Sequence, residues 1–305
     1  MPARFDQCHS ELKSDALVIF LFHGVIPRQR HSVRNYTRKH LQEEEFEIAL
    51  RNLKASGNAL SMPEVLHALQ EGRPFPSNAY AVTFDDGFEN NLTAAAPVLR
   101  RHETPATFYV CSSFVDLNRM SWTDQLECAF EHEGAVSIEA PGLGLESPIS
   151  SPIEKRQALD SIRAYVKNNP KVDPYEYATS ILQSMGAPAL VRDRWLDQKL
   201  SWEQVGALAN DPLFEVGGHG HSHRILSYLS DDELDFELDE SIAKVARATG
   251  RSSDHFSYPE GLEHCYSERV IEQLKKRGIR CSPTAVEGIN FPGADPFRLR
   301  RIFVV

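Results

Sequence analysis

The feature that most constrains the fold is a repeated alternation between short apolar runs and segments with helical periodicity. The apolar runs are rich in Val, Ile, Phe and Tyr. This alternation is typical of βα units around a parallel sheet. We expect seven strands, at 17–22, 79–84, 106–111, 214–217, 255–258, 279–283 and 299–304. A chain of 305 residues is long enough for two average domains or for one α/β barrel of about 250 residues or more.

The segments between these runs carry helix signals. Ser61 and Glu64 form a capping box, and 234–248 has acidic residues early and basic residues late, which matches the helix dipole. The segment 131–198 contains helical stretches such as 154–166 but no convincing strand. We therefore expect a single domain, residues 1–305, in which a helical insertion at about 131–198 interrupts an α/β barrel.

Charge, hydropathy and cysteine content exclude several classes of protein. The chain has 33 Lys and Arg against 43 Asp and Glu, a net charge of -10, and its basic residues are dispersed, so we expect no nucleic-acid partner. The apolar run 16–22 is far shorter than the ~18 residues of a membrane span and has no cleavage pattern after it. Five widely spaced cysteines without a CxxC pair predict free thiols. We expect a cytoplasmic protein without a membrane span.

Two adjacent carboxylates follow the second and clearest strand, in the stretch 83–87 (TFDDG). Asp85 and Asp86 repel each other when both are ionised, and a bound cation would remove that cost. The carboxyl ends of barrel strands are also where active sites assemble. The alternative is a turn with solvated side chains.

Three histidines follow a later apolar run, in the stretch 217–223 (GGHGHSH). In a helical turn, His219 and His223 would share one face and could bind one ion, whereas His221 would point elsewhere. The alternative is a solvated histidine-rich turn. Two imidazoles and one carboxylate form the ligand set of a catalytic divalent metal with open positions, and imidazoles argue against Mg²⁺ and Ca²⁺. The second carboxylate would then be free to act as a general base.

Taken together, these motifs resemble the polysaccharide deacetylases of carbohydrate esterase family 4, which share the NodB-homology fold. The resemblance covers most of the chain. The matching segments are 22–25 (FHGV), 83–87 (TFDDG), 105–108 (PATF), 219–223 (HGHSH) and 256–261 (FSYPEG).

The resemblance implies a distorted (β/α)7 TIM-like barrel and a metal-dependent carbohydrate N-deacetylase, a hydrolase of linear amide C–N bonds. Its substrate would be an N-acetylated, or alternatively N-formylated, amino sugar or glycan precursor of cell-envelope or exopolysaccharide biosynthesis. One divalent metal ion is implied, with Zn²⁺ preferred and Co²⁺, Ni²⁺ or Mn²⁺ as alternatives. The oligomeric state is left open.

The resemblance also implies a role for individual residues. Asp85 would be the general base, and Asp86, His219 and His223 would bind the metal. Tyr258 and Pro259 would shape the wall of a sugar-binding groove. A backbone N–H near Tyr258, together with the metal, would stabilise the oxyanion.

The chain departs from the family pattern at three points. Ser257 lies where the third motif commonly has an Arg, and Arg301 would supply the missing charge or else be a surface residue. The late Leu-x-x-His, whose histidine serves as general acid, is not found. Gly220 replaces the hydroxyl residue that is usual in the second motif.

These departures leave several assignments with alternatives. The candidates for the general acid are His264, His23 and His221, and we select His264 as the catalytic residue. We expect His23 and Arg301 to contact substrate. Trp122 would stack on a sugar or, alternatively, pack the insertion.

Two other functions compete with the deacetylase hypothesis. A non-catalytic carbohydrate-binding barrel would explain the missing third-motif Arg and late His. A metal amidohydrolase acting on a non-sugar amide would use the same ligands.

Overall fold

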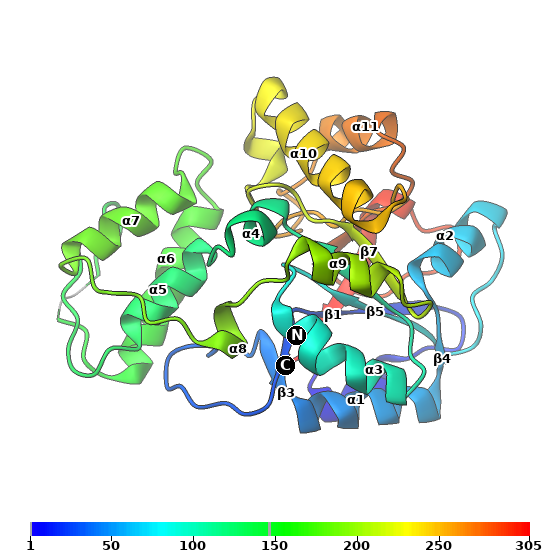
Figure 1. Cartoon of the computed structure of the whole chain (residues 1–305), viewed down its shortest axis with the longest axis horizontal. Coiled ribbons are helices and arrows are strands. Elements are labelled where there is room, and N and C mark those ends of the chain that lie inside the picture. The colour runs from blue at the N-terminus through cyan, green and yellow to red at the C-terminus, as the bar shows by residue number, and fades with distance from the viewer. Residues whose placement is uncertain (1, 146–147) are drawn as a thin grey trace. The chain divides into compact units, whose positions relative to one another are not determined.

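The computed structural model describes residues 2–145 and 148–305. Its centre is a parallel sheet with the strand order β7-β6-β5-β1-β9-β8 (Figure 1). The short strand β4 also belongs to this sheet and pairs with the first two residues of β5. The strands are β1 (Leu17–Phe22), β4 (Asn58–Ala59), β5 (Ala79–Phe84), β6 (Ala106–Val110), β7 (Phe214–Gly218), β8 (Pro283–Glu287) and β9 (Leu299–Phe303). Every residue of β1, β5 and β6 is buried, as expected for parallel strands that are covered on both faces.

The sheet closes on itself through isolated bridges. Gly218 at the end of β7 forms a parallel bridge to Phe256, and His255 forms another to Cys281, just before β8. The segment 255–256 thus stands where a further barrel strand would lie. The predicted α/β fold with a parallel sheet is confirmed, and its geometry is consistent with a distorted barrel.

One strand begins later than the sequence predicts. We expected a strand at 279–283, but β8 starts at Pro283. Proline has no N–H to donate to a ladder, so the first position of a strand is one of the few places in a sheet where it fits. The residues just before Pro283 do not pair with β9 as the residues of β8 do. The N–H groups of Arg280 and Cys281 instead both donate to the Asp254 carbonyl.

Helices and short strands surround this sheet (Figure 1). The helices are α1 (Glu43–Ser56), α2 (Met62–Glu71), α3 (Ala96–Arg101), α4 (Ser112–Leu117), α9 (Trp202–Ala209), α10 (Asp231–Thr249) and α11 (Glu268–Lys276). The shorter elements are η1 (Phe5–Glu11), η2 (Asn91–Ala95), η3 (Leu226–Tyr228), η4 (Pro296–Arg298), and a pair of strands, β2 (Gly24–Ile26) and β3 (His40–Gln42). The predicted capping box at Ser61 and Glu64 is present at the start of α2.

The chain divides into two compact units. The first comprises residues up to 28, 39–119 and 199–305, and the second comprises 29–38 and 120–198. The second unit spans the whole of the expected insertion and is helical, with α5 (Trp122–Phe130), α6 (Pro152–Lys167), α7 (Pro174–Ser184) and α8 (Arg194–Asp197). Glu131 ties the segment 29–38 to this unit, because its carboxylate accepts the N–H groups of Val33 at 2.7 Å and Arg34 at 2.8 Å.

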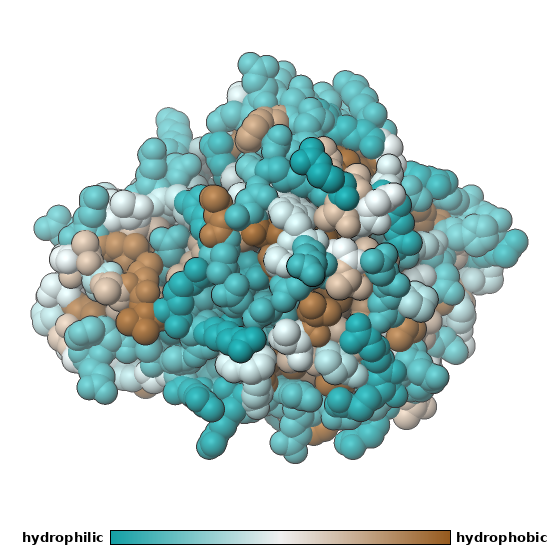
Figure 2. Space-filling view, viewed as in Figure 1, coloured by the Kyte–Doolittle hydropathy of each residue, from teal (hydrophilic) through white to brown (hydrophobic). Residues whose placement is uncertain are grey.

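The second unit has an apolar core of its own, built mainly from α5, α6 and α7. On the face shown in Figure 2, hydrophilic residues predominate and hydrophobic patches lie between them. None of the helices in the described part of the chain has the length and hydropathy needed to span a membrane.

Candidate metal centre and active site

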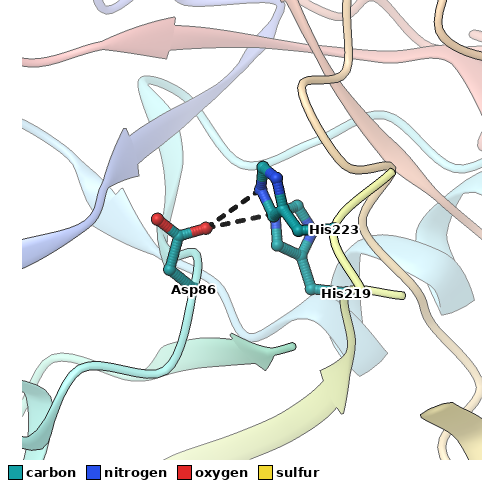
Figure 3. A group of neighbouring side chains, drawn as sticks. All are labelled: Asp86, His219 and His223. Carbon is teal, nitrogen blue, oxygen red and sulfur yellow. Dashed lines mark ion pairs between the residues drawn. The ribbon is translucent and has the colours of Figure 1, made fainter. Parts of the chain in front are cut away.

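Asp86, His219 and His223 meet at the carboxyl ends of two barrel strands (Figure 3). Asp86 follows β5, and the two histidines follow β7. Asp86 Oδ1 lies 3.6 Å from His219 Nε2 and 3.2 Å from His223 Nε2. One ligand atom from each residue lies within 4.8 Å of the other two. The three residues that the sequence suggested as ligands therefore do surround one point.

The side chains of this group fit a divalent cation. Asp86 is 5% exposed and His219 is 2% exposed, and within residues 2–145 and 148–305 no donor reaches Asp86 Oδ1 in hydrogen-bonding geometry. His219 Nδ1 donates to the Ser257 carbonyl at 2.9 Å, which leaves the lone pair on Nε2 for a ligand. Two imidazole nitrogens and a carboxylate oxygen are a donor set that suits Zn²⁺ and similar metals.

The two histidines come together without the helical turn that their spacing suggested. Residues 219–225 form an irregular loop, in which Gly220 has a φ of 73° and His223 a φ of 61°. A left-handed conformation is uncommon for a non-glycine residue and often marks a functional site. Asp86 shares it, with a φ of 76°, so two of the three candidate ligands have a strained backbone.

Gly220, which replaces the usual hydroxyl residue of the second motif, is required by its surroundings. In addition to its positive φ, a Cβ at this position would lie 2.9 Å from Pro259 Cγ. A larger residue would therefore have to displace Pro259 or the histidine loop. The departure from the family pattern follows from this close approach.

Asp85 lies beside the three candidate ligands and is held by Arg301. The guanidinium donates from Nη1 to Oδ1 at 2.9 Å and from Nη2 to Oδ2 at 2.7 Å. Ser257 Oγ adds a hydrogen bond to Oδ2 at 3.3 Å. Burial raises the pKa of the Asp85 carboxyl, but the charge of Arg301, the nearby His219 and the Arg301 hydrogen bonds outweigh burial and hold this pKa below its ordinary value.

Arg301 therefore contacts the expected base. Our assignment of Arg301 to substrate contact is not supported, because its side chain does not face a substrate groove. The side chain is 1% exposed, and its Nε also donates to the Thr284 carbonyl at 2.5 Å. The positive charge missing from the third motif comes instead from β9, and Ser257 accepts a hydrogen bond from the same guanidinium at 3.0 Å.

His23 lies beside Asp85 because of the strand register. Phe22 pairs with Phe84 across β1 and β5, and the Asp85 N–H donates to the Phe22 carbonyl at 3.0 Å. His23 Nδ1 is buried and has no hydrogen-bond partner within the described ranges. Burial lowers the pKa of His23 to about 4, although the charges of Asp86 and Asp85 oppose the shift.

Asn91 anchors the backbone of His23 and was missed in the sequence. Its side-chain Nδ2 donates to the His23 carbonyl at 2.8 Å. Asn91 is fully buried and begins η2, a π-helical turn, a rare element that is frequent at functional sites. One feature of the sequence could have identified it: Asn91 is a polar residue four positions after Gly87, in a segment whose apolar residues recur with helical spacing.

Glu237 is a second functional residue that the sequence did not reveal. Its Oε2 accepts the N–H groups of His221 and Ser222, each at 2.8 Å, and the Ser222 hydroxyl donates to Oε1. It is only 3% exposed. An acidic residue on the inward face of the amphipathic segment 234–248 was the signal that could have identified it.

The other two histidine candidates for the general acid are held by different groups. His221 Nδ1 lies 2.8 Å from Ser112 Oγ. The His264 ring stacks on Tyr228 with centroids 6.0 Å apart, and its carbonyl accepts a hydrogen bond from the Ser227 hydroxyl. The role of His264 as general acid stays a prediction.

Three residues expected to touch sugar are buried. Tyr258 is 0% exposed, its hydroxyl donates to the Phe297 carbonyl at 3.0 Å and its ring stacks on Tyr266. Pro259 is buried next to it. Trp122 is 3% exposed within the core of the second unit, which agrees with the packing alternative. In this structure none of the three offers a ring to a ligand, because all three are buried, Tyr258 and Trp122 within apolar clusters.

Comparisons with known proteins identify the family and the fold of the chain. A model of the polysaccharide deacetylase family matches residues 72–143 and 163–282. The chain belongs to the polysaccharide deacetylase family. Over 57 residues, this family member is 33% identical to the poly-β-1,6-N-acetyl-D-glucosamine N-deacetylase of Escherichia coli K12. That match covers 19% of the chain and only 8% of the relative's length.

Solved structures resemble this chain over nearly its whole length. IcaB from Ammonifex degensii has a TM-score of 0.60 and 18% identity, with 97% of this chain and 94% of that chain covered. Streptococcus pyogenes deacetylase PplD has a TM-score of 0.62 and 15% identity, with coverage of 96% and 94%. The de-N-acetylase from Aggregatibacter actinomycetemcomitans has a TM-score of 0.61 and 15% identity, with 95% of each chain covered. At these identities the likeness shows the fold.

Proposed function

We propose that this member of the polysaccharide deacetylase family is a metal-dependent N-deacetylase of N-acetylated amino sugars in exopolysaccharide or cell-envelope glycans. One observation carries the proposal: Asp86, His219 and His223 surround a single point, and an ionised Asp85 lies beside them. An N-formyl sugar remains the variant substrate. The cytoplasmic location and the lack of a nucleic-acid partner stay predictions.

The residues divide into ligands and a base. When bound by Asp86, His219 and His223, a divalent cation supplies Lewis acidity to the acyl carbonyl and lowers the pKa of water to about 7. Asp85 Oδ2 lies 3.9 Å from His219 Nε2 and so faces the ligand group. This oxygen takes the proton of the water that attacks the acyl carbon. The ion pair with Arg301 keeps Asp85 ionised before that transfer.

The C–N bond then breaks, and the amine nitrogen must receive a proton to leave. His264 stays the predicted proton donor, and His23 is a second candidate, because the register of β1 and β5 places it next to Asp85. Since its pKa is lowered to about 4, the His23 ring is neutral at pH 7 and would first have to take up the proton that Asp85 removed from water. The anchored carbonyl of His23 and its unpartnered Nδ1 support this second candidate. The products are acetate and a sugar with a free amine.

The competing functions are less well supported. The non-catalytic alternative relied on two missing residues, and Arg301 now supplies the charge of one of them. A non-sugar amide would use the same ligands, and only a substrate screen distinguishes it. Family membership favours the glycan.

The decisive test separates metal binding from catalysis. We expect Asp85→Asn to keep its bound metal and to lose most acetate release, because Asp85 is not a ligand. His219→Ala should lose metal and activity together. Elemental analysis of each purified variant and acetate and formate release from N-acyl glucosamine oligomers would measure both.

The matched control is His102→Ala, which removes a histidine that pairs with Glu47 at 3.2 Å away from the ligand group. It should retain both metal and activity. Equal metal loss in Asp85→Asn and His219→Ala would refute the division of roles.

A further inference from the structure

Lys199 is a buried lysine that the proposed mechanism does not use. Its side chain is 1% exposed, although lysine is almost never fully buried unless its charge is compensated. It is the first residue of the first unit after the insertion, and it lies between α8 and α9. The groups around its ammonium therefore indicate its role.

Two aromatic rings face the ammonium of Lys199. Its Nζ lies 3.2 Å from the ring centroid of Phe88 and 5.0 Å from that of Phe114. Both phenylalanines are 0% exposed. A cation within ~6 Å of a ring centroid is attracted to the ring, and the attraction grows when water is excluded. The ammonium therefore draws both rings toward one point.

The two rings lie next to different candidate ligands. Phe88 follows Asp86 by two residues. Phe114, on α4, stacks on the imidazole of His223, with centroids 5.6 Å apart and ring planes 17° from parallel. Through these rings, Lys199 connects the candidate ligand that follows β5 with one that follows β7.

The main chain of Lys199 is fixed to the same two segments. Lys199 forms an antiparallel bridge with Phe88, and the next N–H, that of Leu200, donates to the Gly87 carbonyl at 3.0 Å. The Lys199 N–H donates to the side chain of Asn118, just after α4, at 3.0 Å. Because the backbone is attached on both sides, the ammonium reaches both rings from a fixed position.

The connection ends at the two candidate ligands with a strained backbone. Asp86 has a φ of 76° and His223 a φ of 61°, and such a conformation persists only where the surrounding structure imposes it. The contacts of Lys199 reach Phe88, close to the first of these residues, and Phe114, stacked on the second. They therefore help to impose this conformation before any ion binds.

We infer that Lys199 is a positioning residue: its ammonium, through the two rings, holds Asp86 and His223 in the arrangement that binds the metal, and it does not touch the ion itself. The inference rests on the proposed function only in taking Asp86, His219 and His223 as metal ligands, and it does not depend on the substrate. A positive charge by itself would repel a metal ion. The sign of the change on removing Lys199 therefore separates positioning from a plain charge effect.

The dissociation constant of the metal tests the inference. The full chain is stripped with a chelator, and Zn²⁺ binding is measured by calorimetry at pH 7. In Lys199→Met, which keeps the length of the side chain, we expect the Kd for Zn²⁺ to rise about tenfold or more, as on loss of a residue that orients metal ligands. A Kd that is unchanged or lower in this variant would overturn the inference, since the loss of a repelling charge alone would tighten binding.

Rescue and coupling exclude a general loss of packing. Lys199→Arg keeps a cation that stacks on aromatic rings and should recover most of the affinity. Phe114→Leu should also weaken Zn²⁺ binding, and combining it with Lys199→Met should cost less than the sum of the two single changes in log Kd. Additive changes, or a wild-type Kd in Phe114→Leu, would overturn the inference. The second of these outcomes is measurable even if Lys199→Met does not fold.

The matched control is Lys155→Met, in the second unit. Lys155 is 4% exposed and its Nζ donates to the His132 carbonyl at 2.6 Å, so this variant also loses a buried ammonium. Its Kd for Zn²⁺ should equal the wild-type value. An equal rise in Lys155→Met and Lys199→Met would show that the loss of any buried lysine loosens the site, and would overturn the inference.

Metal binding and acetate release keep this inference distinct from the proposed function. A wild type that binds Zn²⁺ more tightly than Lys199→Met, but releases no acetate from N-acyl glucosamine oligomers, would support the inference and refute the deacetylase. A wild-type Kd in Lys199→Met would refute the inference, while acetate release by the wild type would still support the deacetylase.

Discussion

Asp85 ionises in a buried setting because Arg301 faces it, although 216 residues separate the two in the chain. Both side chains are at least 95% inaccessible to solvent. A buried pair of this kind is costly to break, by about 3–5 kcal/mol, because the remaining charge has no partner. The ability of Asp85 to act as a base therefore depends on the guanidinium of Arg301, which lies outside the local sequence motif of Asp85.

Replacing Arg301 should change both the pH profile and the stability. In Arg301→Met the burial of Asp85 is no longer offset, so the pKa of its carboxyl rises and the acid limb of kcat/KM moves up by about one pH unit or more. The lowered pKa in the wild type stabilises the fold above the unfolded-state pKa of about 4, and this stabilisation is lost as pH falls through the folded-state pKa. Arg301→Met should lose it at neutral pH as well.

The measurements are a pH–rate profile and urea unfolding at pH 7, where we expect a loss of about 3 kcal/mol. Arg301→Lys is the control, because it keeps the charge but not the two parallel hydrogen bonds, and should fall between wild type and Arg301→Met. An acid limb that does not move in Arg301→Met would show that Arg301 does not set the pKa of the base.

At the scale of elements, a row of aromatic rings aligns the strands that carry the site. The register of β1, β5 and β6 places Phe22, Phe84 and Phe108 side by side, with centroids 5.4 Å and 5.1 Å apart. Phe46 of α1 packs edge-on against Phe84 at 5.7 Å. Since Asp85 directly follows Phe84, the packing of this row fixes where the carboxylates emerge.

Phe84→Ala should therefore destabilise the fold by about 3–5 kcal/mol, because it leaves a cavity between three other rings. Phe84→Leu fills part of that space and should cost less. Urea unfolding would measure both, with Phe291→Ala, on the surface, expected within about 0.5 kcal/mol of wild type. A cost below about 1 kcal/mol for Phe84→Ala would mean that the aromatic row does not organise these strands.

At the scale of the whole molecule, a metal ion would link strands β5 and β7 of the barrel. Asp86 follows β5 and the two histidines follow β7, with β6 between these strands in the sheet. An ion that binds the folded chain better than the unfolded chain stabilises the fold by mass action, by about 2.7 kcal/mol at 100 times its Kd. Global stability and the local site are thus coupled.

Metal addition should accordingly raise the thermal midpoint of the stripped protein. At saturating Zn²⁺ we expect a rise of about 5 °C or more, reversed by a chelator. Differential scanning calorimetry would measure it, and His219→Ala should show no rise. The same rise in His219→Ala would place the stabilising ion at some other site.

The sequence by itself determined the parallel α/β fold, the positions of most strands, and the pair of carboxylates and two histidines of the candidate site, among which the family resemblance singled out Asp86 as a ligand. Each depends on short-range patterns, namely apolar runs, a pair of carboxylates at a strand end and two histidines four residues apart. The loop of those histidines was nevertheless assigned the wrong local geometry, because a helical turn and a left-handed loop both accept this spacing.

Only the tertiary structure decided which residues support those ligands. Arg301 reaches Asp85, His23 lies beside it and Lys199 lies against two buried rings because strands and helices far apart in the chain are packed together. The same packing buries Tyr258 and Pro259, which the family resemblance had assigned to a sugar-binding groove, and it buries Trp122, for which packing of the insertion was the alternative. Short-range patterns specify which side chains stand at the end of a strand. The burial and the partners of those side chains depend on the elements that cover that end. The closure of the barrel determines which elements these are.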